Sequence, residues 1–196
     1  MKIFHHRRNT VSEILEVPQT DGVEIDLRSS NGEIILQHDP FLVGEHFKDW
    51  LKSWEGQELI LNVKEEGIEL RILELLEDFK VHEYFFLDQS FPFMVKTLKM
   101  GNRRVAARVS DLESIETSLK IESAWAWLDC FSGDWGFIQS AVPILHSAQK
   151  KVCLVSPELV RIDVDDELLY LQRIIRENNL VIDGVCTKRK IDWVTS

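Results

Sequence analysis

The sequence predicts an α/β protein in which short parallel strands alternate with amphipathic helices and close into a compact (β/α)8 TIM-type barrel. Apolar strand-like segments and helix-period segments alternate along all 196 residues, and about eight strand–helix units can be counted. The chain is near the lower limit of about 200 residues for such a barrel, so we expect short loops and no large insertion domain. An open doubly wound sheet is the alternative, but no Gly-x-Gly-x-x-Gly follows the first strand.

The expected strands are short and rich in aliphatic and aromatic residues. They cover Lys2–His6, Gly22–Leu27, Glu58–Lys64, Glu83–Leu87, Arg103–Ala107, Ala124–Cys130, Lys151–Val155 and Leu180–Cys186. Helices are expected between them, because apolar residues recur at helical spacing. These residues are Phe47, Trp50, Leu51 and Trp54, then Leu70, Leu73, Leu76 and Phe79, and in a long last helix Leu168, Leu169, Leu171, Ile174 and Ile175. Pro92 suits a helix N-terminus, and Asp111 is expected to be an N-cap.

Composition favours a single globular domain over residues 1–196. Hydrophobic residues make up 44% of the chain, which is enough for a core, and no Gly- or Pro-rich linker divides it. The formal net charge of −10 argues against a broad nucleic-acid-binding face and against docking on an anionic membrane. It is compatible with a small anionic ligand, because a few local cations or a metal ion reverse the sign inside a pocket.

Localisation is expected to be cytoplasmic. No apolar run reaches the roughly 18 residues that a membrane span needs, and the first residues do not resemble a signal peptide. Cys130, Cys153 and Cys186 are far apart and form no C-x-x-C pair, so we interpret them as small buried hydrophobes of a protein in a reducing compartment. Nothing in the sequence indicates an oligomeric state.

Glu24 and Asp26 are the first candidates for chemistry. They are two residues apart on an expected strand, so both side chains point to the same face. Two carboxylates on one inward face repel each other, and a divalent cation with oxygen ligands, Mg²⁺ or Ca²⁺, is the simplest compensation. The alternative is a structural pair that forms salt bridges with Arg7, Arg28 or Lys64.

Further polar residues fall at the ends of neighbouring strands. His6 and Arg7 end the first strand, and Asn62 and Lys64 share a face at the end of the third. His38 follows a turn and a short apolar run that would return it over the strand ends. Two histidines near a phosphate can act as general base and general acid, and Arg7 and Lys64 can bind the phosphate. For Lys64, the alternative is a lysine that extends along the surface into solvent.

The segments His6-Arg7, Glu24-Ile25-Asp26 and His38-Asp39 together resemble the glycerophosphodiester phosphodiesterase family, within the phosphatidylinositol-phospholipase-C-like barrels. Ser90-Phe91 and the segment 182–187 resemble the family's fourth and last strands, so the likeness extends along the chain. The resemblance implies a metal-dependent phosphodiesterase for a small glycerol- or sugar-linked phosphodiester. It implies that Glu24, Asp26 and Asn62 hold the divalent cation (Mg²⁺ or Ca²⁺), that His6 and His38 are the acid–base pair, and that Arg7 and Lys64 contact phosphate.

The chain departs from the family pattern in a few places. Arg8 stands where the family has Gly, and Lys188 follows Thr187 where it has Asp. Asn62 stands where the third acidic ligand is usual; its carbonyl oxygen suits a hard cation but carries no charge. The alternative function is therefore a barrel that binds a phosphorylated glycerol or sugar without turnover. A purely structural partner in an assembly is a third hypothesis, and no feature of the sequence favours it.

Overall fold

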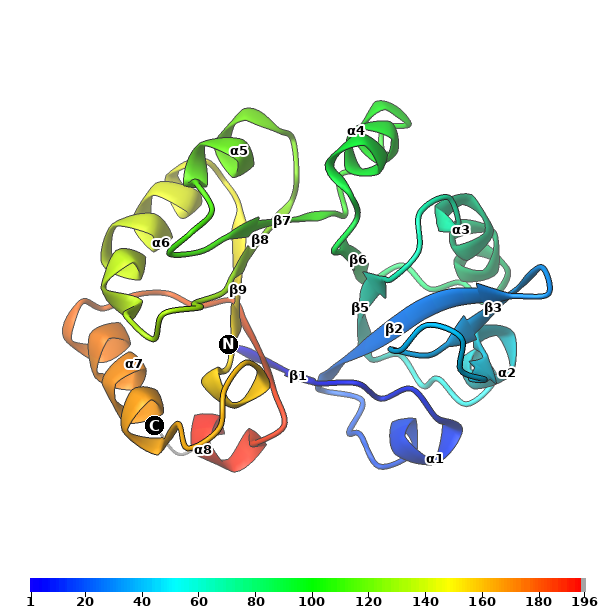
Figure 1. The fold of residues 1–196 in the computed structure, drawn as a ribbon, viewed down its shortest axis with the longest axis horizontal. Coiled ribbons are helices and arrows are strands. Elements are labelled where there is room, and N and C mark those ends of the chain that lie inside the picture. The colour runs from blue at the N-terminus through cyan, green and yellow to red at the C-terminus, as the bar shows by residue number, and fades with distance from the viewer. Residues whose placement is uncertain (195–196) are drawn as a thin grey trace. The chain divides into compact units, whose positions relative to one another are not determined.

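The computed structural model describes residues 1–194 and has an α/β fold that divides into two compact units. Unit 1 comprises Met1–Ile3 and the chain from Ala106 onward, and unit 2 comprises Phe4–Val105. Strand β1 (Lys2–His5) therefore contributes residues to both units. Figure 1 labels most of the elements. Among residues 1–194, no helix is both long enough and apolar enough to span a bilayer.

Unit 2 is built on four strands in parallel register. In addition to β1, these are β2 (Gly22–Ser30), β5 (Glu58–Val63) and β6 (Tyr84–Leu87). Two short strands, β3 (Glu33–Leu36) and β4 (Glu45–His46), extend the sheet from β2 in antiparallel pairs. The helices are α1 (Val11–Ile14), α2 (Phe47–Leu51), α3 (Glu69–Asp78) and α4 (Phe91–Lys99).

Strands β2 and β5 lie in the middle of the sheet of unit 2, and both faces of each strand are buried there. Every residue of Glu58–Val63 is buried, and so is Gly22–Leu27 in β2. Val23, Ile25 and Leu27 are fully buried in the apolar core. Because side chains alternate along a strand, Glu24 and Asp26 are on the opposite face. The register pairs Asp26 with Asn62, so residues on these two strands are direct neighbours.

Unit 1 repeats the same strand–helix alternation. Strands β7 (Ala106–Val109), β8 (Trp125–Leu128), β9 (Lys151–Val155) and β10 (Gly184–Thr187) pair in parallel. Helices α5 (Ile115–Lys120), α6 (Ile138–Ser147) and α7 (Asp165–Glu177) lie along one side of these strands in Figure 1. The unit also contains two short 3-10 turns, Trp135–Phe137 and Pro157–Leu159, and a last helix, α8 (Lys190–Val194). Its core joins residues of all four strands to Ile138, Leu145, Leu171 and Trp135.

The sequence predicted the α/β class and all eight parallel-paired strands. The expectation of a purely parallel sheet was wrong, because two further strands among residues 1–194, β3 and β4 of unit 2, pair antiparallel. Strand β7 begins at Ala106 rather than Arg103, and β10 at Gly184 rather than Leu180. Asp111 is not an N-cap. Ser114 caps α5, and the Asp111 carboxylate instead accepts hydrogen bonds from the backbone N–H groups of Phe131 and Ser132.

The start of β2 needs a residue without a side chain. A Cβ at Gly22 would lie 2.2 Å from Cδ1 of Phe4, a fully buried ring that packs edge-on against Phe85. We expect Gly22→Ala to lower the free energy of unfolding by about 2 kcal/mol, because overpacking forces the ring out of its rotamer. Thermal denaturation followed by circular dichroism measures the loss. The double variant with Phe4→Leu should recover part of it, and an unchanged melting temperature for Gly22→Ala would contradict this account.

Candidate active site

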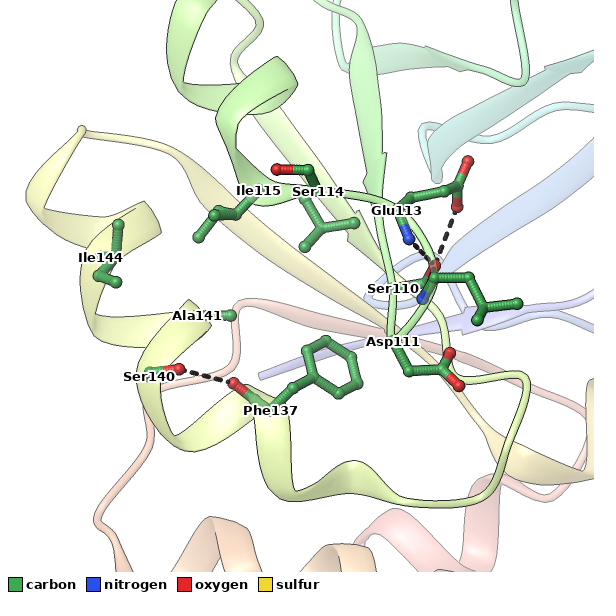
Figure 2. A pocket seen from close by; sticks show the side chains of 11 residues that line it. Ser110, Asp111, Glu113, Ser114, Ile115, Phe137, Ser140, Ala141 and Ile144 are labelled. Atoms are coloured by element: carbon green, nitrogen blue, oxygen red, sulfur yellow. Dashed lines mark hydrogen bonds between the residues drawn. The ribbon is translucent and has the colours of Figure 1, made fainter.

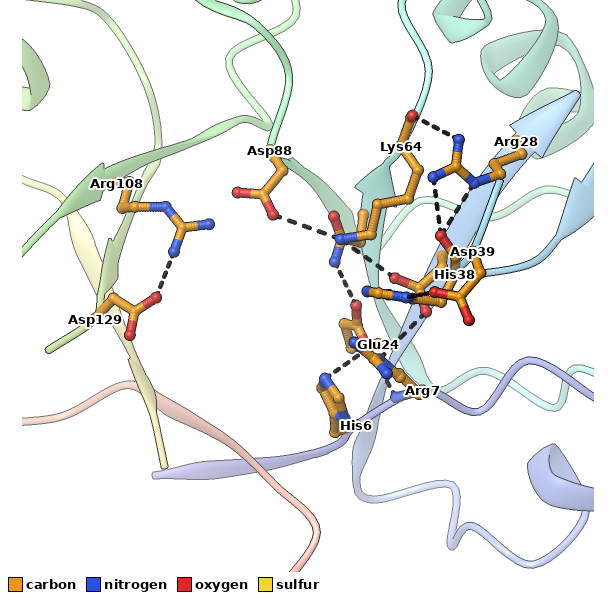
Figure 3. A network of polar contacts seen from close by, with 12 residues as sticks. His6, Arg7, Glu24, Arg28, His38, Asp39, Lys64, Asp88, Arg108 and Asp129 are labelled. Atoms are coloured by element: carbon orange, nitrogen blue, oxygen red, sulfur yellow. Dashed lines mark hydrogen bonds and ion pairs between the residues drawn. The ribbon is translucent and has the colours of Figure 1, made fainter. Parts of the chain in front are cut away.

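The candidate site lies where β1, β2 and β5 of unit 2 end, and Figure 3 shows its side chains. Parallel strands present their carboxyl ends at the same edge of a sheet, which is where α/β enzymes place reactive groups. His6 and Arg7 follow β1, Glu24 and Asp26 are in β2, and Asn62 and Lys64 are at the end of β5. The structure brings these six residues, all predicted from the sequence, into one polar cluster.

Glu24 is an almost completely buried carboxylate, with a side chain 1% exposed. Its Oε1 atom accepts a hydrogen bond of 2.7 Å from the Nδ2 amide of Asn62. Its Oε2 atom accepts one of 2.7 Å from the backbone N–H of Arg7, and the Nε2 atom of His6 lies 3.8 Å from the same oxygen. The turn after β1 therefore places both His6 and the Arg7 backbone against Glu24.

The electrostatic environment of Glu24 favours its protonated form. Burial away from water raises the pKa of Glu24 from 4.5 to about 7, and the nearby charge of Asp26 acts in the same direction. Hydrogen bonds from Asn62 and from the Arg7 backbone oppose this rise, as does the positive charge of Lys64. Buried carboxyl groups with strongly raised pKa values are enriched at functional sites.

Asp26 is surrounded by donors and cations. Its Oδ2 atom accepts a hydrogen bond of 2.8 Å from Asn9, whose own Oδ1 accepts one of 2.9 Å from the Asp26 backbone N–H. The Arg7 Nε atom lies 3.7 Å from Oδ2, and the Lys64 Nζ atom lies 3.5 Å from Oδ1. Of the three salt-bridge partners considered from the sequence, Arg7 and Lys64 thus approach Asp26. Lys64 also lies 3.7 Å from Asp88, so it does not extend freely into solvent.

His38 reaches the site on the segment that follows β3. The backbone N–H of Gln37 donates a hydrogen bond to the Asp26 carbonyl. The Arg28 guanidinium donates two hydrogen bonds to the His38 carbonyl. A third Arg28 bond goes to the Lys64 carbonyl, so one guanidinium joins both loops. The His38 Nδ1 atom pairs at 2.7 Å with Asp39, and this hydrogen bond lowers the pKa of the Asp39 carboxyl. The pair orients the ring, which is 35% exposed.

The oxygen atoms of this cluster fit a divalent cation. Asp26 Oδ1 and Asn62 Oδ1 are buried and accept no hydrogen bond from any residue that the structure describes. Buried acceptors of this kind are costly unless they are satisfied, and carboxylate and amide oxygens are the ligands that Mg²⁺ and Ca²⁺ prefer. The cluster holds two carboxylates rather than three, and residues 1–194 contain no group of three or more His, Cys, Asp or Glu arranged around a metal position.

The sequence did not single out Asn9, Asp88, Arg28 or Asp39 as site residues, although the first three contact the cluster and Asp39 pairs with His38. The sequence beside Asn9 contains a pattern that could have identified it as a site residue. Asn9 directly precedes Thr10, which forms a capping box with Glu13 at the start of α1, and this fixed turn directs Asn9 to Asp26. No such pattern marks Asp88, because its approach to Lys64 depends on the register of β5 and β6.

A hollow of about 420 Å³ belongs to unit 1 and is shown in Figure 2. It is lined by the loop between β7 and α5 and by part of α6. The Ser110 hydroxyl accepts hydrogen bonds from the backbone of Leu112 and Glu113 and donates one to the Glu113 carboxylate. These polar groups hold the loop itself, so the hollow does not enter the proposed function.

Asn62 gives a direct test of the cation site. Asn62→Asp adds a third carboxylate in place of the amide that donates to Glu24. We expect affinity for Mg²⁺ or Ca²⁺ to rise at least about tenfold and the melting temperature of the metal-free protein to fall, because like charges accumulate in a buried site. Calorimetric titration and thermal denaturation measure the two effects. Asn31→Asp, in an exposed turn, makes the same change in net charge and should change neither the cation affinity nor the melting temperature. Unchanged cation affinity in Asn62→Asp would argue against Asn62 as a ligand.

Comparisons with known proteins agree on the fold. No family model matches the sequence, and no curated protein matches it. Solved structures of three glycerophosphodiester phosphodiesterases are similar over nearly their full length. The Thermotoga maritima protein has a TM-score of 0.75 at 16% identity, covering 98% of this chain and 96% of its own. The Agrobacterium tumefaciens protein has a TM-score of 0.71 at 12% identity, covering 100% of both chains. The Parabacteroides distasonis protein has a TM-score of 0.68 at 12% identity, covering 99% of this chain and 97% of its own. The family resemblance read from the sequence is thus confirmed in three dimensions, and the chain has the fold of these phosphodiesterases.

Proposed function

We propose that the chain is a metal-dependent phosphodiesterase that acts on a small glycerol- or sugar-linked phosphodiester. One observation carries the proposal: two buried carboxylates, two cations and a histidine are in contact at the carboxyl edge of β1, β2 and β5. The fold shared with glycerophosphodiester phosphodiesterases supports it. We further propose that residues 1–196 act as one (β/α)8 domain in the cytoplasm.

Arg7 and Lys64 would bind the phosphate. Arg7 has a side chain 41% exposed, so its guanidinium can turn from Asp26 toward a ligand and donate two parallel hydrogen bonds to phosphate oxygens. Lys64 is 18% exposed and is held between Asp26 and Asp88, which fixes its ammonium as a point charge at the edge of the site.

His6 and His38 would exchange the protons. One ring accepts the proton of the attacking hydroxyl group or water, and the other donates a proton to the leaving oxygen. His38 is suited to this because Asp39 occupies Nδ1 and leaves Nε2 for proton transfer. His6 is positioned by its place beside Glu24.

Glu24, Asp26 and the Oδ1 atom of Asn62 would hold the cation, Mg²⁺ or Ca²⁺. When bound, the cation polarises a phosphate oxygen and offsets the charge that develops in the transition state. The two buried oxygen atoms without hydrogen bonds, on Asp26 and Asn62, support this assignment. The Asn62 Nδ2 atom donates to Glu24, which leaves the Oδ1 atom of the same amide as the oxygen ligand.

A second candidate function is recognition of a phosphorylated glycerol or sugar without turnover. The donor role of Asn62 favours it, since together with Arg7 and Lys64 it partly balances both carboxylates from within the chain. Such a protein would keep anion binding through Arg7 and Lys64 and would need no cation.

Calorimetric titration of the metal-free protein with Mg²⁺ and Ca²⁺ separates the two candidates, with Asp26→Ala as control. We expect binding that the control abolishes, followed by turnover of glycerophosphodiesters in the presence of the bound ion. If neither ion binds at millimolar concentration with a substrate analogue present, and phosphate still binds, the chain is a phosphate-binding barrel and the enzyme proposal fails.

A further inference from the structure

The loop that follows the candidate acid–base residue His38 ends in an exposed apolar tip. The tip consists of Pro40, Phe41, Leu42 and Val43, and all four residues are exposed. Among residues 1–194, Phe41 and Val43 are the most exposed large hydrophobic side chains, at 102% and 93%. A single exposed apolar residue is ordinary, whereas a contiguous group beside a polar site indicates an interaction surface.

The backbone of the tip is held in a costly conformation. Phe41 has a φ of 65°, in the left-handed region that a bulky residue rarely adopts. Strain of this kind persists where the surrounding structure imposes it, and it is concentrated at functional sites. Here the strain directs an aromatic ring into water, so neither burial nor backbone preference explains why Phe occupies the position.

The base of the loop is rigid. The Gln37 side chain donates to the Val43 carbonyl at 3.0 Å and accepts from the Asp39 N–H, which closes the loop on itself. Gly44 lies so close to β3 that a Cβ would be 2.2 Å from the Leu36 carbonyl oxygen. A hollow of about 320 Å³ separates the tip from β2 and β3, and it is lined by the four tip residues together with Arg28, Ser29, Ser30, Ile35 and Glu65. The tip therefore projects from a loop that hydrogen bonds close at its base, and a hollow separates it from the body of unit 2.

We propose that this tip inserts into a lipid surface and so presents the site to phosphodiesters that lie in that surface. The first half of the inference stands on the tip alone, and the second half rests on the proposed function. Exposed Phe, Leu and Val side chains on a rigid loop are suited to the boundary between headgroups and acyl chains. His38 is three residues from Phe41, so insertion brings the acid–base residue to the headgroup level.

Size and charge favour a lipid surface over a protein partner. A stable protein interface buries about 800 Å² on each partner, which is more than these four side chains offer. Asp39 borders the tip, and the chain has a formal net charge of −10. We therefore expect binding to zwitterionic lipid by apolar insertion, with little dependence on salt and no gain from anionic lipid.

Co-sedimentation with vesicles of phosphatidylcholine tests the binding half. Phe41→Asn removes the ring and keeps a residue that tolerates the left-handed conformation, so the fold is preserved and the melting temperature should not fall. We expect this variant to lower the partition coefficient about tenfold and Val43→Thr to lower it less. Leu15→Asn, at a side chain 63% exposed outside the loop, is the matched control and should bind as the unmodified chain does.

Three results overturn the binding half: a chain that stays in the supernatant at millimolar phosphatidylcholine, equal losses in the Leu15→Asn control, or a Phe41-dependent dimer in sedimentation velocity without vesicles.

The activity half is tested by comparing turnover of a phosphodiester that bears one acyl chain with turnover of its deacylated counterpart. Phe41→Asn should slow turnover of the first about tenfold and leave the second unchanged, and equal losses on both overturn this half. Vesicle binding without turnover of either substrate leaves the tip assignment intact and counts against the proposed function instead.

Discussion

Replacing Glu24 by Gln should make the metal-free protein more stable at about pH 8 and should abolish divalent-cation binding at the proposed site. The pKa of Glu24 rises from 4.5 to about 7 on folding, first through burial and then through the charge of Asp26. The folded state thus binds this proton more tightly than the unfolded state does, so the contribution of Glu24 to stability is present below pH 4.5 and is lost as the pH rises through about 7. Above that range, the charged carboxylate costs on the order of 3 kcal/mol.

The glutamine side chain that replaces Glu24 would remain neutral at every pH. Its Oε1 can accept the Arg7 N–H, and its Nε2 can donate to the Asn62 carbonyl once that amide turns over, which satisfies the buried oxygen there. We expect the melting temperature to rise by about 5–10 °C near pH 8 and by much less near pH 5.

Scanning calorimetry at the two pH values measures the stability effect. The control Glu77→Gln makes the same change in net charge at an exposed position of α3 and should change stability by less than about 0.5 kcal/mol. Millimolar Mg²⁺ or Ca²⁺ should stabilise the unmodified chain and not the Glu24→Gln variant. If the melting temperature of Glu24→Gln rises equally at both pH values, burial of the Glu24 charge is not the cause of the rise.

The sequence predicted much of this site because its pattern there is local. Alternation along β2 assigns Glu24 and Asp26 to one face whatever lies beside the strand, and the order of the parallel strands then brings Asn62 and Lys64 to the same edge. The hairpin of β2 and β3 was missed as a pair of strands, although its turn was recognised. A four-residue apolar run such as Glu33–Leu36 does not reveal whether it pairs, or in which direction.

Other features depend on contacts between distant residues. The orientation of the Asn62 amide follows from its neighbour Glu24, and the two are 38 positions apart in sequence. The expected N-cap at Asp111 failed for a similar reason: its carboxylate binds a loop some 20 residues away, and the closer Ser114 caps the helix. Local preference identifies which residues are able to cap, and tertiary packing selects the one that does.

His6→Ala and His38→Ala should each lower kcat by about 10²–10⁴-fold, the range typical of a lost general acid or base. His5→Ala is the matched control. His5 adjoins His6 in the chain, but its Nε2 atom pairs at 2.8 Å with Asp21, away from the carboxylate cluster. We expect this control to lower the melting temperature and to change kcat by less than about threefold.

The pH–rate profile distinguishes catalysis from positioning. If His6 and His38 are the acid–base pair, loss of either should remove one limb of a bell-shaped profile of kcat/KM. The double variant should then be little slower than the slower single variant, because the two groups would act as one unit. Asp39→Asn should have a smaller effect, about tenfold, with a shifted profile, since Asp39 acts only by orienting His38 through Nδ1. If both alanine variants keep full turnover, the assignment of His6 and His38 as the acid–base pair is wrong.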